Sequence, residues 1–330
     1  MKPIVIHTHL HKRKTGVTRS IENVFPFLNE HCETYLYGEH IDGPKISKKK
    51  LKELLFSDRK VVVHCHRNNE IMALLKYRLL GAKFHLVATR HSATKPSGLT
   101  RLLLKKADQV VSLVKSVHQN LGIENVCIPH GVNTDEFKPN GATILSEISQ
   151  QHIILNTGRI RQSKGQQTLI EACALLKDHP DWALVMVGKV DSDSFLEGLK
   201  GQIQEYDISN QVYFIPETTD IVPYYRAAEI FVAPSHSEGF ALVTAEAMAC
   251  ECTVIATKDV GVHSEMIEHG KSGYLFEAGN SEELKSVLHE IISGDLPRLE
   301  KPARKEIVNH WSARLEAERL AELYLKLSQK

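Results

Sequence analysis

Short apolar runs alternate with longer segments of helical period along nearly the whole chain, and this order occurs once in each half. Such alternation is typical of βαβ units, whose strands form a parallel sheet. Several runs contain almost no polar residue, as expected where helices cover both faces of a sheet. We therefore predict an α/β fold with two doubly wound, Rossmann-like domains. The predicted strands are PIVIHTH, VVVHCH, FHLVAT, QVVSL and VCIPHG in the first half, and IILNTG, ALVMVG, VYFI, IFVAP, TVIAT and YLF in the second.

The two halves are separated by FKPNGATILSEISQQ, which contains Pro139, Asn140 and Gly141 and few large apolar residues. We place the linker there, between an N-terminal domain over residues 1–140 and a C-terminal domain over residues 150–310. Residues 311–330 carry leucines at helical spacing and predict an amphipathic helix that needs a surface to pack on. Ligands of doubly wound folds bind at the carboxyl ends of the strands, so we expect the chemistry in a cleft between the domains.

Charge is divided between the halves, although the net charge of the chain is only +1. Residues 1–150 hold 23 Lys and Arg against 13 Asp and Glu, a balance of +10. This leaves 18 against 27, or −9, for residues 151–330. An asymmetry of this size usually reflects a partner.

Cysteine and hydropathy patterns bear on the compartment. The six cysteines include no Cys-x-x-Cys pair, as is usual for a chain kept reduced. The N-terminal MKPIVIHTHLHKRK has too short an apolar stretch for a signal peptide, and no run approaches the roughly 18 apolar residues of a membrane span. We therefore expect a cytoplasmic protein without a membrane-spanning segment.

The stretch SHSEGFALVTAEAMAC places Glu238 in a loop directly after the predicted strand IFVAP. Gly239 allows a tight turn into a helix that we expect to begin near Leu242. The first backbone amides of that helix have no partner within it and lie at the positive end of its dipole, which suits a diphosphate. We therefore predict that Gly239, Phe240, Ala241 and Leu242 bind a ligand that carries a diphosphate.

Glu246 lies about one turn into the same helix, among residues that are apolar on most sides. A carboxylate buried there without a partner costs several kcal/mol, of order ~3 or more. Helical side chains lean toward the N-terminus, so its oxygens are expected to meet what the loop binds, for instance the paired hydroxyls of a ribose. The alternative is a surface glutamate on an otherwise buried helix.

The segment from Glu238 to Glu246 resembles the Glu-x(7)-Glu element of retaining glycosyltransferases with the GT-B fold, of the family 4 type. The resemblance implies that Glu238 contacts the donor sugar and Glu246 the ribose. Where the family usually has a glycine before the helix, this chain has Ala241, which keeps the backbone amide. The final helix, after Trp311, resembles the family's element that crosses back onto the N-terminal domain.

A second motif, NTGRIRQSKGQQTL, follows the first strand of the C-terminal half and carries Arg159 and Lys164. Fixed cations stabilise the negative charge that develops on a departing nucleoside diphosphate. The loop is not a Walker A motif, because Lys164 precedes Gly165 and no Gly-Lys-Ser/Thr follows. The resemblance implies phosphate binding by Arg159 and Lys164; a solvated basic turn is the alternative.

Two residues of the N-terminal half are candidates for the donor side. His91 directly follows the strand FHLVAT, where the family carries a histidine beside the donor sugar, so we predict a sugar contact and not a general base. Gly16 in HKRKTGVTRS opens a helix and lets backbone amides approach a phosphate or the acceptor. The alternatives are an incidental loop histidine and an ordinary glycine turn with Thr18 as the helix N-cap.

The stretches HLHKRKTGVTRSIENV, HCHRNNEIMALL and TRHSATKPSGLTRLLLKKADQVV resemble lipopolysaccharide core mannosyltransferases of this group. This implies mannose transfer from GDP-mannose to an acidic Kdo residue on a lipid A precursor, at the inner membrane face. The basic N-terminal half agrees, since acceptor and bilayer are anionic. We predict acceptor contacts at Arg67, Arg90 and Lys95. Lysines and arginines of residues 12–14 and 45–52 are either solvated or touch an anionic lipid surface.

Contacts to the nucleotide base are expected to be mostly backbone ones, near Gly188 and Glu217. We expect no metal ion, no other cofactor and no nucleic-acid partner, and find no pair of carboxylates suited to a double displacement. Three alternatives stay open: a nucleotide-sugar epimerase of the same fold, a transferase that uses a UDP-sugar on another glycan, and a non-catalytic sugar-nucleotide or lipopolysaccharide-binding protein.

Overall fold

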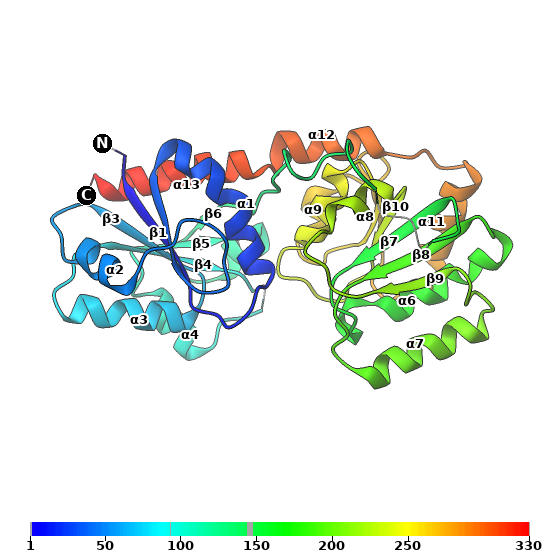
Figure 1. Ribbon diagram of the computed structural model, residues 1–330, viewed down its shortest axis with the longest axis horizontal. Helices are drawn as coiled ribbons and strands as arrows, with labels where there is room; N and C mark the ends of the chain where they lie inside the picture. Colours follow the sequence, from blue (N-terminus) through cyan, green and yellow to red (C-terminus); the bar gives the residue numbers. More distant parts are fainter. Residues whose placement is uncertain (1, 93, 144–147, 330) are drawn as a thin grey trace. The chain divides into compact units, whose positions relative to one another are not determined.

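A computed structural model describes residues 2–92, 94–143 and 148–329. It divides into two compact units (Figure 1). Unit 1 comprises the chain up to Asn133 together with the residues from Trp311 onward, and unit 2 runs from Thr134 to His310. The expected linker includes residues 144–147, which lie outside the described residues.

Unit 1 contains a six-stranded parallel sheet in the order β2-β1-β3-β4-β5-β6. Five of these strands match the predicted runs. The sixth, β2, was not predicted: it lies at the edge of the sheet and alternates buried and partly exposed residues, so it forms no continuous apolar run. The strands are Ile4–His9 (β1), Glu33–Gly38 (β2), Val61–Cys65 (β3), His85–Arg90 (β4), Gln109–Ser112 (β5) and Val126–Cys127 (β6).

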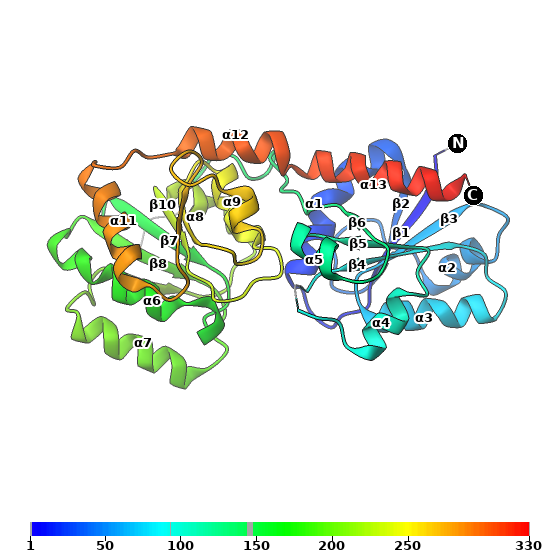
Figure 2. The ribbon, with the colours of Figure 1, turned by 180° about the vertical axis from the view of Figure 1, so that it is seen from behind.

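Helices cover both faces of this sheet. Ile4 and Ile6 of β1 pack in a core with α2, α3 and α4, whereas Val5 between them packs with α1 and α13. Figures 1 and 2 show α1 and α13 side by side on one face, and the two helices are in contact. The bounds are Gly16–His31 (α1), Lys48–Leu55 (α2), Asn68–Leu79 (α3), Gly98–Leu104 (α4), Lys115–Asn120 (α5) and Ala313–Ser328 (α13).

Helix α1 begins at Gly16, the residue that the sequence indicated would open a helix. Its N-cap is Thr15, and Thr18 is the third helical residue, whose hydroxyl accepts a hydrogen bond from the Thr15 amide at 2.9 Å. The alternative with Thr18 as N-cap is therefore wrong. A threonine at each position of this capping box satisfies backbone donors that the helix itself leaves unpaired.

Unit 2 contains a second six-stranded parallel sheet, in the order β12-β11-β10-β7-β8-β9. All six predicted strands are present. The strand order reverses between β7 and β10, which is where ligands of doubly wound sheets bind. The strands are His152–Thr157 (β7), Trp182–Val187 (β8), Val212–Ile215 (β9), Ile230–Ala233 (β10), Thr253–Thr257 (β11) and Tyr274–Phe276 (β12).

The helices of unit 2 also lie on both sheet faces. The segment that follows Gly165 is an α-helix, α6, that continues as a 3₁₀ helix over Cys173–Asp178. Helices α6 and α11 pack in one core on one face of the sheet, whereas α8, α9 and α12 pack on the opposite face. The bounds are Gln166–Ala172 (α6), Asp193–Glu205 (α7), Val222–Ala227 (α8), Leu242–Ala249 (α9), His263–Met266 (α10), Ser281–Ser293 (α11) and Glu300–His310 (α12).

All six cysteines are free thiols. Among the described residues, no helix is both long enough and apolar enough to cross a membrane.

Candidate functional site

The two motifs of unit 2 meet at the point where the strand order reverses. Lys164 ends a one-turn 3₁₀ helix after β7, and Glu238 follows the adjacent strand β10. Gly165, between Lys164 and α6, has a left-handed backbone with φ of 69°. A Cβ atom there would lie 1.9 Å from the carbonyl oxygen of Pro234, so only glycine lets the two loops approach this closely.

Lys164 and Glu238 form an ion pair. The Lys164 Nζ atom lies 2.5 Å from Glu238 Oε1, and the Ser235 hydroxyl donates to the same oxygen at 2.7 Å. The side chains of Lys164 and Glu238 are only 17% and 12% exposed, so water screens their attraction weakly. The fold thus brings together the cation predicted for the diphosphate and the carboxylate predicted for the sugar.

The segment from Gly261 into helix α10 packs against Glu238, and the sequence motifs did not reveal it. A Cβ atom on Gly261 would lie 2.9 Å from the Glu238 Cβ atom, so the backbone there packs directly on the glutamate. The buried His263 ring bonds the Thr244 hydroxyl at 3.0 Å and the Thr257 carbonyl at 2.9 Å. Burial lowers the pKa of His263, which favours a neutral ring in this supporting role.

The start of α9 has an unusual backbone at Ala241. This residue is the N-cap of α9 and adopts the left-handed conformation, with φ of 79° and ψ of 52°. A Cβ atom makes that conformation cost of order 1 kcal/mol, a cost that a glycine at this place would avoid.

Glu246 is buried, with 4% of its surface exposed, so the alternative of a surface glutamate is wrong. Its Oε2 atom accepts a hydrogen bond from the Tyr225 hydroxyl at 3.0 Å. That hydroxyl also lies 2.8 Å from the Thr157 hydroxyl, at the end of β7. Burial, and then the nearby Glu246 carboxylate, raise the pKa of Tyr225 well above its usual range, so Tyr225 stays a proton donor to Glu246. Tyr225 is therefore a partner of this buried carboxylate, and no motif had singled it out.

Arg159 and the predicted base-contacting residues lie along the same edge of the sheet. The Arg159 guanidinium is 3.4 Å from Asp191, and its backbone carbonyl accepts from Gln166 at 2.9 Å. A Cβ atom on Gly188, after β8, would lie 1.8 Å from the Gly158 carbonyl oxygen. Glu217 is exposed beyond the outer strand β9.

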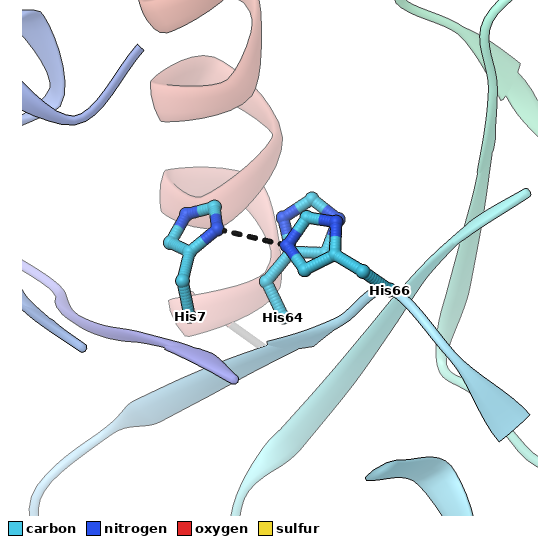
Figure 3. Close-up of side chains that lie close together, drawn as sticks. All are labelled: His7, His64 and His66. Atoms are coloured by element: carbon cyan, nitrogen blue, oxygen red, sulfur yellow. Dashed lines mark hydrogen bonds between the residues drawn. The ribbon is translucent and has the colours of Figure 1, made fainter. Parts of the chain in front are cut away.

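In unit 1, His91 follows β4 and both of its ring nitrogens have protein partners. Its Nε2 atom lies 3.0 Å from His66 Nδ1, and its Nδ1 atom lies 3.2 Å from His130 Nε2. Gly16, at the start of α1, is exposed, and a Cβ atom there would meet nothing within 4 Å. His91, which is half-buried, thus joins a cluster of buried histidines that the sequence motifs did not reveal, although His7, His64 and His66 recur in the strand ends HTH and HCH (Figure 3).

The predicted acceptor residues differ in their surroundings. Arg67 donates to the Thr15 hydroxyl at 2.9 Å, and Arg90 donates to the Thr94 carbonyl at 2.8 Å. The Nε atoms of both arginines are buried and have no hydrogen-bond partner among the described residues. Lys95 is exposed in the loop after β4.

A family model described as glycosyl transferases group 1 matches residues 143–308, which is half of the chain. The chain belongs to this glycosyltransferase family. The resemblance seen in the sequence motifs is thereby confirmed. The glycosyltransferase is 28% identical over 331 residues to the lipopolysaccharide core biosynthesis mannosyltransferase LpcC of Rhizobium leguminosarum bv. viciae, a match that covers 96% of this chain and 93% of the relative. It is 31% identical to the mannosyltransferase LpsB of Rhizobium meliloti, over 72% of this chain and 70% of the relative.

A solved structure shows the same fold. HepE of Anabaena, crystallised with UDP-glucose, matches the glycosyltransferase with a TM-score of 0.80 and 17% identity, over 98% of this chain and 99% of that one. The prediction of a two-domain α/β protein of the GT-B type is confirmed.

Proposed function

We propose that this glycosyltransferase transfers mannose from GDP-mannose to a Kdo residue of a lipopolysaccharide inner-core acceptor, with retention of configuration. The observation that carries the proposal is the match to LpcC, a lipopolysaccharide core biosynthesis mannosyltransferase, because it extends over both units of the chain. The N-terminal unit is included, and in glycosyltransferases of this type that unit reads the acceptor.

The donor site of the proposal is built on Lys164 and Glu238. A lysine ammonium has three N–H donors, so Lys164 can hold Glu238 Oε1 and still donate to a diphosphate oxygen. Glu238 then keeps its second oxygen for a sugar hydroxyl. Arg159 adds a second cation from the same loop, and the first amides of α9 add neutral donors.

The ribose part of the donor site is formed by Glu246 and Tyr225. Tyr225 occupies one carboxylate oxygen of Glu246 and fixes the orientation of the group. A carboxylate held in this way is suited to accept hydrogen bonds from a pair of ribose hydroxyls. In this proposal the nucleotide base is bound by backbone groups near Gly188 and Glu217, at the ends of β8 and β9.

In the proposed reaction the acceptor hydroxyl oxygen attacks the anomeric carbon from the side of the leaving group. The bond from that carbon to the diphosphate oxygen breaks, and GDP leaves with the bonding electron pair. A phosphate oxygen of the leaving group takes the hydroxyl proton, which balances the step. Arg159 and Lys164 stabilise the charge that develops on the diphosphate, and the proposal includes no metal ion.

The acceptor side is assigned to Arg67, Arg90 and Lys95. The two buried Nε atoms of Arg67 and Arg90 are donors that a carboxylate or phosphate of the acceptor can satisfy. Such a partner would compensate the cost of leaving buried donors unpaired.

An exposed leucine patch supports contact with the cytoplasmic face of the inner membrane. We define this patch as Leu79, Leu80, Leu99 and Leu102, which are 88%, 72%, 53% and 57% exposed. They lie on or beside α3 and α4, which pack against each other (Figure 1). Apolar side chains beside basic ones favour an anionic bilayer surface. The basic residues on the same helices and their ends are Lys76, Lys83, Arg101, Lys105 and Lys106.

Donor selection tests the proposal. We expect GDP-mannose, and not UDP-glucose or UDP-N-acetylglucosamine, to raise the melting temperature, since a ligand that binds only the folded state stabilises it. Stabilisation by a UDP-sugar, without stabilisation by GDP-mannose, would instead favour a transferase that uses a UDP-sugar on another glycan. Incubation with the donor alone should leave it unchanged, whereas its conversion to an epimer would identify an epimerase.

A further inference from the structure

A chain of hydrogen-bonded side chains runs through the interior of unit 1 and begins at Thr89. The Thr89 hydroxyl lies 2.6 Å from His64 Nε2, and His64 Nδ1 lies 2.6 Å from the Tyr324 hydroxyl. The same hydroxyl is 3.3 Å from His7 Nε2. These contacts join strands β4, β3 and β1 to helix α13.

The chain continues through three more histidines to a carboxylate. His7 Nδ1 lies 3.1 Å from His66 Nε2, and His66 Nδ1 lies 3.0 Å from His91 Nε2. His91 Nδ1 is 3.2 Å from His130 Nε2, and His130 Nδ1 is 2.9 Å from Glu316 Oε1. Both ring nitrogens of each of the five histidines therefore take part in one continuous sequence of contacts.

The Glu316 carboxylate determines the direction of this chain. Its Oε2 atom accepts from the Gly131 amide at 2.7 Å, and as an acceptor it requires His130 Nδ1 to donate to Oε1. A neutral imidazole that donates at Nδ1 must accept at Nε2. Applied ring by ring, this rule gives all five histidines the Nδ1–H tautomer, with Tyr324 donating to His7 and Thr89 donating to His64.

One additional proton fits this chain without breaking a hydrogen bond. A protonated ring donates at both nitrogens, so the part toward Glu316 keeps its direction and the part toward Thr89 reverses. The most stable position is His130, because its charge then lies beside the Glu316 carboxylate. A second protonated ring would also donate at both nitrogens. Two N–H groups would then face each other at one of the contacts between the two charged rings.

We propose that the chain from Thr89 to Glu316 stores a single proton, and that its uptake at His130 switches His91, His66, His7 and His64 together from Nδ1–H to Nε2–H. The burial of the chain agrees with this limit of one proton. Burial lowers the pKa of His7 to about 3 and holds the pKa values of His64, His66 and His91 well below their usual range. A cavity beside the rings measures about 10 Å³, which leaves room for about one water molecule, so no file of waters replaces the chain.

Other ionisable groups among the described residues also lie near the hydrogen-bonded chain. From the turn after β3, Arg67 and Glu70 face His91 and the His66 backbone, and Arg90 of β4 faces His91. Cys32, after α1, lies near Tyr324. Glu316 is the carboxylate bonded to a ring of the chain.

A metal ion held by His7, His64 and His66 is the competing arrangement, since their ligand atoms lie within 4.8 Å of one another (Figure 3). The ring geometry opposes it. A metal lies in the plane of each imidazole that binds it, but the His64 and His66 rings are stacked, with centroids 4.6 Å apart and planes inclined by 21°. His7 and His66 instead meet edge to edge, through the nitrogens joined by the dashed line in Figure 3.

The hydrogen-bonded chain also determines the tautomer of His91. In so far as His91 contacts the donor sugar, which rests on the proposed function, Glu316 acts as a positioning residue two contacts away. It decides which nitrogen of His91 carries the hydrogen.

Histidine nitrogen NMR of the full-length protein tests the proposal directly. At pH values above the midpoint of proton uptake, we expect all five histidine rings to carry their hydrogen on Nδ1. On acidification, His130 should become cationic while the other four rings change to Nε2–H at one common midpoint. Separate midpoints, mixed tautomers at neutral pH, or two cationic rings in the folded protein would overturn the proposal. So would one equivalent of zinc in the purified protein.

The variant Glu316→Gln tests the role of the carboxylate. The Gly131 amide must donate to the glutamine carbonyl oxygen, so the amide NH₂ faces His130 Nδ1, which then has to accept. We expect all five rings to be Nε2–H and neutral over the whole pH range, although three of the rings lie far from the substitution. Glu318→Gln, at an exposed position of α13, should leave the spectrum unchanged. A change confined to His130 in Glu316→Gln would contradict the proposal.

Tyr324→Phe provides a second test if Glu316→Gln does not fold. It removes the link between His64 and His7, so His64 should stop switching with the other rings, which should still share one midpoint. If His64 still changed tautomer at the same midpoint as the other rings, the proposed hydrogen-bonded chain would be wrong. These spectra do not depend on transferase activity, so a failure of the proposed function leaves their outcome unaffected.

Discussion

The ammonium of Lys164 lies 2.5 Å from the carboxylate of Glu238, although the two residues are 74 positions apart and follow different strands. Adjacent strands β7 and β10 bring their loops together, and Gly165 permits the close approach. The pair stands where the strand order of unit 2 reverses, so both residues are available to a ligand at that edge.

Removal of either member of this pair should impair transfer. We expect Lys164→Ala and Glu238→Ala each to lower kcat/KM by about 10²- to 10³-fold, the usual effect of losing one preorganised group aimed at the reacting centre. Steady-state kinetics with matched melting curves measures this. Lys177→Ala, which removes an exposed lysine of the same unit, is the control. Full activity in Glu238→Ala would show that the site is assigned wrongly.

The left-handed backbone at Ala241 predicts an unusual response to glycine. Ala241→Gly relieves strain of about 1 kcal/mol but gives the unfolded chain more entropy, about 0.4–1 kcal/mol, so the net change should be small. Ala73→Gly, the same replacement within helix α3, should cost about 1 kcal/mol. Urea denaturation compares the two variants. Equal losses at both positions would contradict the backbone conformation described for Ala241.

The bond from Tyr225 to Glu246 should matter for stability and for donor affinity. Tyr225→Phe leaves a buried carboxylate oxygen without this donor, which we expect to cost about 1–3 kcal/mol of unfolding free energy. Donor binding should weaken as well, because Glu246 loses its fixed orientation. Calorimetric titration with the donor and denaturation of the same samples measure both effects. Tyr224→Phe, the less buried neighbour, is the control, and an equal effect of the two changes would refute this role.

The buried histidines predict that acid destabilises unit 1. The pKa of His7 is lowered to about 3, and those of His64, His66 and His91 are also lowered, so the unfolded chain binds more protons than the folded one below pH ~6.5. The free energy of unfolding should then fall as the pH falls, by about 1.4 kcal/mol per pH unit for each such proton. Denaturation at about pH 7.5, 6.5 and 5.5 measures the slope. Constant stability across this range would contradict the neutral, buried state of these rings.

The leucine patch predicts binding to anionic vesicles. Burial of one leucine side chain contributes about 1.5–3 kcal/mol, so Leu80→Glu or Leu102→Glu should weaken vesicle binding about tenfold or more. Vesicle co-sedimentation at constant salt measures this. Leu325→Glu alters an exposed leucine on α13 and should have little effect. If all three variants bind alike, the patch does not contact the bilayer.

The sequence predicted those parts of the fold that depend on local patterns. Buried strands such as β3 are continuous apolar runs, and they were found; β2 was missed because one side of it is exposed at the sheet edge. For α1 the prediction that Gly16 opens the helix agrees with the structure, whereas the alternative N-cap Thr18 lies three residues beyond the true cap, Thr15; the two threonines are equally good capping residues by type.

The candidate site was predictable where a motif is contiguous and unpredictable where partners are distant. Glu238 and Glu246 belong to one motif, but Tyr225 comes from another helix and was found only in the structure. The histidine chain joins residues as far apart as His7 and Tyr324, and nothing in the local sequence of either indicates the contact.

The most direct test of the proposed function is a transfer assay with purified protein, GDP-mannose and Kdo-lipid A, analysed by mass spectrometry. We predict an acceptor that gains one hexose, in α linkage as in the donor, and loss of this product in the Glu238→Ala variant. An unmodified acceptor with GDP-mannose, together with hexose transfer from a UDP-sugar to a different glycan, would contradict the account.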